Sequence, residues 1–270
     1  MIELFEQNIK TNDRQSSKGN QLKWENSNIW YKSDYTGYEG LTEYVISRLL
    51  QFSDLNSDEY ILYTPIQIKY KTKIYNGVYS HDFLKDGYKI ITLERLWQSC
   101  YGSSLNHAIW TIRDPKERLE YIVTKIENIT GLQDFGKYLN KILTIDMMFL
   151  NEDRHTHNLA VIMSDSGEYE YCPIFDNGAG LLADTTMDYP LEEDIYKLID
   201  SVKAKTISLD FEEQTNVSEI LYGENIHFKF TKKDVEDILN SQDASIYPIE
   251  IRERVKKVIY EQMRKYPYLF

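Results

Sequence analysis

Cysteine is scarce in this sequence, and long apolar stretches are missing. The two cysteines, Cys100 and Cys172, lie far apart and form no CxxC arrangement, so we expect neither a disulfide framework nor a structural zinc site. The longest apolar runs, such as MMFL at 147–150, are far too short to cross a bilayer, and the start, MIELFEQNIK, shows no basic segment followed by an apolar one. The sequence therefore indicates a cytoplasmic protein with no membrane partner.

Basic residues are outnumbered by acidic ones. The chain of 270 residues has 31 Lys and Arg against 43 Asp and Glu, a formal net charge of −12. A chain this acidic repels phosphate backbones unless its basic residues gather in one place, so we expect no direct nucleic-acid partner. A small anionic ligand can still bind, because a few local Lys and Arg outweigh distant acids over a screened distance of roughly 8–10 Å.

The apolar pattern changes near residues 93–105. Before that point the sequence predicts one helix at 39–52 and short strands, which lie at 21–24, 29–33, 60–70, 75–83 and 87–93. After it the spacing is mostly helical, and the clearest helices lie at 115–131, 137–150 and 249–266. A hairpin at 159–175 interrupts them. We therefore predict an α+β fold with a small β-rich lobe, residues 1–95, and a larger, mostly helical lobe, residues 96–270.

The stretch NEDRHTHN, residues 151–158, combines two acids, two amides, an arginine and two histidines. Asp153 is followed five residues later by Asn158, and Asp176 comes after the predicted hairpin. Phosphoryl transfer from ATP needs a carboxylate that orients or deprotonates the attacking hydroxyl, and oxygen ligands that hold Mg²⁺. An Asp and an Asn five residues apart can divide these tasks, and a second Asp completes the metal site, as in protein kinase catalytic loops.

The motif NxDRHxxN, followed by a hairpin and DNG, resembles the HipA-like kinases, and DRHxxN is also similar to the catalytic loop of phosphoinositide kinases. The resemblance implies a two-lobed protein kinase-like fold that uses ATP and Mg²⁺. It matches Asp153 to the catalytic Asp, Asn158 to the metal-binding Asn and Asp176 to the DFG-type metal Asp. His155 matches the His of DRH, which in the lipid kinases is a candidate base or transition-state stabiliser.

The same resemblance gives Asn151 and Arg154 the task of shaping the loop. Two other interpretations of the stretch stay open at this point. A metal hydrolase could use His155 and His157, because an HxH pair on an extended segment points both rings the same way. The stretch could also be a polar loop that only joins a helix to a hairpin.

The first lobe offers a partner for ATP phosphates. Lys32 lies on the predicted strand IWYKS, and Glu43 lies on the next helix on the same face as Ile46 and Leu50. An unpaired carboxylate on an apolar face would be costly to bury. We therefore predict an ion pair between Lys32 and Glu43, in which Glu43 positions the lysine that contacts the phosphates.

Two further segments are interpreted from the resemblance and from their order along the chain. SSKGNQLK, residues 16–23, resembles the HipA-family phosphate loop, with Ser16 and Gly19 as phosphate-binding positions. Ser16 is also a candidate for inhibitory autophosphorylation, and Ser17 is an equal one. GYKIITLERL, residues 87–96, falls where the hinge of a kinase should be, so we expect main-chain groups up to Glu94 to meet the adenine.

The sequence thus predicts an ATP- and Mg²⁺-dependent kinase that phosphorylates a protein Ser or Thr. A small-molecule or lipid kinase, or an ATP-binding module without turnover, are the alternatives. HipA toxins carry an additional N-terminal subdomain before the phosphate loop, whereas only residues 1–15 precede it here. We therefore expect a minimal kinase core.

Overall fold

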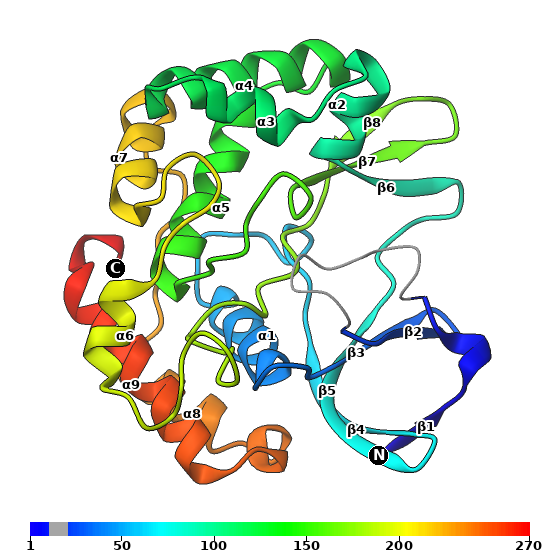
Figure 1. Cartoon of the computed structure of the whole chain (residues 1–270), viewed down its shortest axis with the longest axis vertical. Coiled ribbons are helices and arrows are strands. Elements are labelled where there is room, and N and C mark those ends of the chain that lie inside the picture. Colours follow the sequence, from blue (N-terminus) through cyan, green and yellow to red (C-terminus); the bar gives the residue numbers. More distant parts are fainter. Residues whose placement is uncertain (11–20) are drawn as a thin grey trace. The chain divides into compact units, whose positions relative to one another are not determined.

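The structure is a computed structural model that describes residues 1–10 and 21–270. The chain forms two compact units, each assembled from separate stretches (Figure 1). The first unit comprises Met1–Phe83, Phe175–Val202 and Phe228–Phe270, and the second comprises Leu84–Ile174 and Lys203–His227. The division predicted from the sequence is a single cut between residues 95 and 96, and as a lobe boundary it stays a prediction.

A curled five-stranded sheet lies in the first unit, with the strand order β1-β4-β5-β3-β2. The strands are β1 (Ile2–Leu4), β2 (Lys23–Asn26), β3 (Ile29–Ser33), β4 (Thr64–Tyr70) and β5 (Lys73–His81). β1 pairs with β4 in parallel, and the remaining neighbours are antiparallel. After the short 3₁₀ turn Glu6–Asn8, an isolated bridge joins Ile9 to Trp24 of β2, and the Lys10 N–H donates to the Lys23 carbonyl at 2.9 Å.

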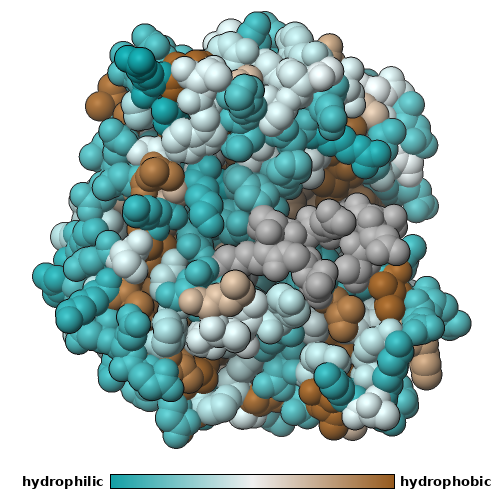
Figure 2. All heavy atoms as spheres, in the orientation of Figure 1, coloured by the Kyte–Doolittle hydropathy of each residue, from teal (hydrophilic) through white to brown (hydrophobic). Residues whose placement is uncertain are grey.

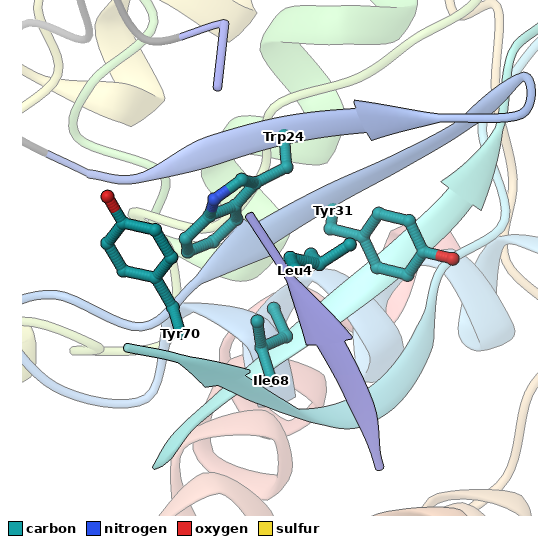
Figure 3. Packing of buried hydrophobic residues seen from close by; sticks show 5 residues of the cluster. All are labelled: Leu4, Trp24, Tyr31, Ile68 and Tyr70. Carbon is teal, nitrogen blue, oxygen red and sulfur yellow. The ribbon is translucent and has the colours of Figure 1, made fainter. Parts of the chain in front are cut away.

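The inner face of this sheet is apolar and aromatic. It carries a cluster of buried side chains (Figure 3), namely Leu4, Trp24, Tyr31, Ile68 and Tyr70. The Trp24 and Tyr70 rings meet edge to face with centroids 5.5 Å apart. Because successive side chains on a strand point to opposite faces, Tyr31 in this cluster places Lys32 on the other face of β3.

The helix α1 (Glu39–Leu50) of the first unit is buried along nearly its whole length. α1 contacts β4, β5 and α8 (Lys232–Leu239). The unit also contains α6 (Ile195–Ser201), α9 (Ile249–Lys265) and the 3₁₀ turns Asp243–Ile246 and Pro267–Leu269. Arg254 of α9 fixes the start of α1, because its guanidinium donates to the Tyr38 hydroxyl at 3.3 Å and to the Tyr189 carbonyl at 2.9 Å.

The second unit combines helices with a small antiparallel sheet of order β6-β7-β8. Its strands are β6 (Tyr88–Thr92), β7 (Ala160–Ser164) and β8 (Tyr169–Tyr171). Its helices are α2 (Leu93–Tyr101), α3 (Leu105–Thr111), α4 (Pro115–Thr130), α5 (Phe135–Phe149) and α7 (Phe211–Tyr222). α5 is the central helix, since it packs against both α4 and α7 and is buried on nearly all sides.

Most predicted elements are confirmed, as is the α+β fold class. The hairpin at 21–33, the helix at 39–52 and the helices at 115–131 and 137–150 are present as β2–β3, α1, α4 and α5. The prediction of a strand from residue 60 is wrong at its start, because β4 begins at Thr64. β1 was not predicted.

No helix in the described part of the chain is long and apolar enough to span a membrane. On the face drawn in Figure 2, apolar residues lie in separate patches among hydrophilic ones.

Candidate active site

Lys32 lies at the centre of a charged cluster in the first unit. Its Nζ is 2.9 Å from Glu43 Oε1 and 2.8 Å from Asp176 Oδ1, and it also donates to the Tyr63 hydroxyl at 3.4 Å. The lysine comes from β3, the glutamate from α1 and the aspartate from the segment that begins at Phe175. The ion pair predicted between Lys32 and Glu43 is therefore present, with Asp176 as a second carboxylate partner.

The electrostatics of the cluster keep Lys32 charged. Burial alone would lower the pKa of Lys32, but the carboxylates of Asp176 and Glu43 outweigh it, and the pKa lies well above its usual value. The side chains of Lys32 and Glu43 are 15% and 3% exposed. The ammonium of Lys32 is thus held between two carboxylates in a site mostly shielded from water.

The DNG sequence is fixed against α1 by its backbone. Asp176 adopts a left-handed conformation with φ of 59°, which Asp tolerates better than most residues. The Asn177 N–H donates to Glu43 Oε2 at 3.0 Å. A Cβ at Gly178 would lie 3.3 Å from Glu43 Cγ, so a larger residue there would require the glutamate to shift by a few tenths of an ångström. Glu43 thus holds both Lys32 and the backbone next to Asp176.

The loop 151–158 in the second unit is anchored by a residue that sequence analysis missed. Asp146 of α5 is fully buried and pairs with Arg154, whose Nε lies 3.0 Å from Asp146 Oδ2. Asp146 Oδ1 also accepts from Asn151 Nδ2 at 2.8 Å. Leu150, with φ of 54°, ends the helix and turns the chain into the loop. Arg154 and Asn151 thus shape the loop as the resemblance implied.

Asp153 and Asn158 are in direct contact. Asn158 Nδ2 donates to the Asp153 carbonyl at 2.8 Å and to Asp153 Oδ2 at 3.2 Å. Because the nitrogen of the amide faces Asp153, its oxygen Oδ1 is the atom that can ligate a cation. Carboxylate and amide oxygens are the ligands that Mg²⁺ prefers, so this donor set fits the predicted metal.

His155 faces the same carboxylate. Its Nε2 is 3.7 Å from Asp153 Oδ1, and its Nδ1 accepts a hydrogen bond from the His157 N–H at 3.1 Å. A ring nitrogen that accepts a hydrogen bond carries no proton, so this arrangement assigns the proton of a neutral imidazole to Nε2. Burial lowers the pKa of His155, although Asp153 opposes the shift. Both observations describe a neutral histidine that points its N–H toward Asp153.

The two histidines do not form a metal-binding pair. Residues 155–158 form a turn rather than an extended strand, and the rings of His155 and His157 are perpendicular, at 89°. The described residues contain no group of three or more His, Cys, Asp or Glu side chains placed to hold a metal. The metal-hydrolase interpretation therefore loses the geometry on which it depended.

Glu94 is hydrogen-bonded both to the loop 151–158 and to the start of α3. Its N–H donates to the Thr156 carbonyl at 3.1 Å, and its carboxylate accepts from the N–H groups of Leu105 and Asn106 and from Thr156 Oγ1 at 2.7 Å. Glu94 therefore connects the starts of α2 and α3 to the loop 151–158. Its contact with adenine stays a prediction, and its N–H is already engaged within the protein.

The predicted phosphate loop falls mostly outside the described residues. Ser16, Ser17 and Gly19 lie there, so their roles stay predictions. The residues that follow are held by β3: Gln21 Nε2 donates to the Ser33 carbonyl at 2.9 Å, and buried Lys23 pairs in register with Lys32.

Comparisons with known proteins agree with this fold. No protein-family model matches the chain, and no curated protein matches it. Among solved structures, the Helicobacter pylori proinflammatory kinase CtkA matches with a TM-score of 0.58 at 15% identity, over 98% of this chain and 94% of that chain. The chain shares the fold of this kinase. HipA of Shewanella oneidensis MR-1, solved with HipB and operator DNA, aligns over 97% of this chain and 55% of its own, at 13% identity and a TM-score of 0.39.

Proposed function

We propose that the chain is an ATP- and Mg²⁺-dependent kinase that phosphorylates Ser or Thr residues of a protein. The observation that carries the proposal is the contact of Lys32 Nζ with Glu43 and Asp176 at 2.9 and 2.8 Å. The cluster holds a buried lysine between a helix glutamate and the acid of the DNG sequence. This arrangement matches the need of a kinase for a phosphate-binding cation next to a metal ligand.

The remaining roles are those that the sequence suggests. Lys32 is proposed to contact ATP phosphates and to be positioned by Glu43, and Asn158 and Asp176 are proposed as Mg²⁺ ligands. When bound, Mg²⁺ supplies positive charge to the phosphates. Ser16 and Gly19 are proposed to contact phosphate, and the segment ending at Glu94 to contact adenine.

Asp153 acts on the acceptor. Its carboxylate orients the acceptor hydroxyl and takes its proton as the hydroxyl oxygen forms a bond to the γ-phosphorus. The bond from the γ-phosphorus to the β–γ bridging oxygen breaks, and its electron pair leaves on ADP. The amide of Asn158 donates to the Asp153 carboxylate and holds it in place, and His155 Nε2 lies 3.7 Å from the same carboxylate.

The test is phosphate transfer from labelled ATP with Mg²⁺. Asp153→Asn and Asp176→Asn should each lower the rate by roughly 100-fold or more. Asp58→Asn changes an exposed aspartate and should transfer at the wild-type rate. Transfer that persists in Asp153→Asn would contradict the proposal.

A panel of protein, lipid and small-molecule acceptors distinguishes the acceptor class. Binding of ATP without transfer to any acceptor would identify a nucleotide-binding module instead. A cytoplasmic location and the lack of a nucleic-acid partner stay predictions from composition.

A further inference from the structure

The segment between α6 and α7 presents two lysines to solvent. Along residues 203–206 exposed and buried side chains alternate: Lys203 and Lys205 are exposed, whereas Ala204 and Thr206 are buried. Alternation with a period of two is that of an extended chain. Lys203 and Lys205 are therefore chemically matched neighbours on the same side of one segment.

This segment contacts the residues on both sides of Asp153. Thr206 Oγ1 donates a hydrogen bond to the Arg154 carbonyl. Lys205 Nζ lies 4.0 Å from Oε2 of Glu152, whose side chain is 9% exposed. The side chain of Thr206 is thus bound to the residue directly after Asp153. The ammonium of Lys205 lies beside the residue directly before Asp153.

Positive charge is needed near Asp153 during phosphoryl transfer, because the transferred group carries negative charge on its oxygens. Arg154 cannot supply it, since its guanidinium is buried against Asp146. The side chain of Lys205 is 45% exposed, and its Nζ lies 4.0 Å from Glu152 Oε2, at the outer limit for an ion pair. This flexible side chain can therefore turn toward an incoming anion.

We propose that Lys205 is a catalytic residue that donates a hydrogen bond to an oxygen of the γ-phosphoryl group of ATP. The inference rests on the kinase function proposed above. Lys205 stays protonated throughout: the proton of the acceptor hydroxyl goes to Asp153, and the electron pair of the broken bond leaves on ADP. The ammonium only neutralises charge on the group in transfer.

Nucleotide binding tests this contact without turnover. Titration calorimetry with Mg²⁺ compares ADP with a non-hydrolysable ATP analogue in the wild type, Lys205→Gln and the matched control Lys203→Gln. Lys205→Gln should weaken binding of the analogue about tenfold and leave ADP unchanged, since one charged hydrogen bond is lost. Lys203→Gln should bind both as the wild type does.

The outcomes separate this inference from the proposed function. If Lys205→Gln keeps the wild-type ratio of analogue to ADP affinity, the contact with the γ-phosphoryl group is wrong and the kinase proposal stands. If the wild type binds neither nucleotide, the kinase proposal and this inference fail together.

Steady-state kinetics gives a second measurement. Lys205→Gln should lower kcat roughly 10- to 100-fold with the KM of the acceptor unchanged, and Lys205→Arg should recover part of the loss because the charge is kept. A loss confined to the KM of an acidic acceptor would assign Lys205 to acceptor binding and overturn the inference.

Discussion

Glu94 is a buried carboxylate that connects two helices to the loop 151–158. Its carboxylate accepts hydrogen bonds from the N–H groups of Leu105 and Asn106 at the start of α3, and from the hydroxyl of Thr156 in the loop 151–158. Burial alone would raise the pKa of Glu94, but hydrogen bonds from Ser104, Thr156 and Asn106 outweigh it and lower the pKa. The folded protein therefore stabilises the charged form of the Glu94 carboxylate.

This lowered pKa predicts how Glu94→Gln behaves. A carboxyl whose pKa in the folded state lies below its ordinary value of 4.5 stabilises the fold above that pH, and the contribution is lost as the pH falls through the lower, folded-state pKa. We expect Glu94→Gln to reduce the free energy of unfolding by about 1–2 kcal/mol at pH 7 and by much less near pH 3. Urea unfolding across this pH range measures both.

The control for this experiment is Glu117→Gln, which changes an exposed glutamate in the first turn of α4. It should change the stability little at either pH. An equal loss of stability in Glu94→Gln at pH 7 and at pH 3 would show that shape, not charge, is what matters at Glu94.

Some contacts of the site could be predicted from local sequence, and others could not. An unpaired Glu43 on an apolar helix face would be costly to bury. This cost predicts the ion pair between Glu43 and Lys32. The contact of Lys32 with Asp176 spans 144 residues, and no local pattern carries that information. Asp146 did leave a signal, because a carboxylate in the apolar helix KYLNKILTIDMMFL needs a buried partner, but the sequence alone does not show that the partner is Arg154.

At the scale of elements, the Asp146–Arg154 pair connects α5 to the loop 151–158. Both side chains are almost completely buried, at 0% and 2% exposed. Removing one partner of such a pair leaves an uncompensated charge, which costs about 3–5 kcal/mol. We therefore expect Asp146→Ala to lower the free energy of unfolding by this amount, measured by urea denaturation.

A double variant separates stability from catalysis. Asp146→Leu with Arg154→Met replaces the pair by apolar groups of similar size and should recover much of the lost stability. It should not recover phosphate transfer, since the hydrogen bonds of Asp146 to Asn151 and of Arg154 to the Asn158 carbonyl are gone. Full activity in the double variant would show that the loop keeps its shape without the pair.

Elements with strong local signals were predicted well. α4 begins with Asp114, which accepts from the N–H groups of Lys116 and Glu117, and ends at Gly131 with φ of 74°, both standard helix signals. β1 has only three residues and pairs with distant β4, so periodicity cannot reveal it. Residues 60–63 are apolar and largely buried, yet the strand ladder begins only at Thr64.

At the scale of the whole molecule, the two units determine which fragments can fold. The first unit needs stretches from three parts of the chain. The Tyr38 hydroxyl, for instance, donates to the Leu181 carbonyl and accepts from Arg254, and α1 packs against α8. The change from strand-like to helical apolar spacing near residue 95 does not show which distant stretches complete the core of the first unit.

We predict that residues 1–95 expressed alone lack a fixed tertiary structure, because the buried side chains of α1 lose α8 and the segments around Leu181 and Arg254. The measurement is amide dispersion in a proton–nitrogen correlation spectrum, with the full chain as the control. A dispersed spectrum from the fragment would show that the β-rich half is an independent domain.

The bridge between Ile9 and Trp24 has a consequence for how this protein behaves in a crowded solution. Exposed strand edges invite pairing between molecules and thus aggregation. Here the outer side of β2 is engaged by residues 9 and 10, and the other end of the strand order is β1, only three residues long. The curled sheet therefore offers neighbouring molecules little edge on which to add a strand.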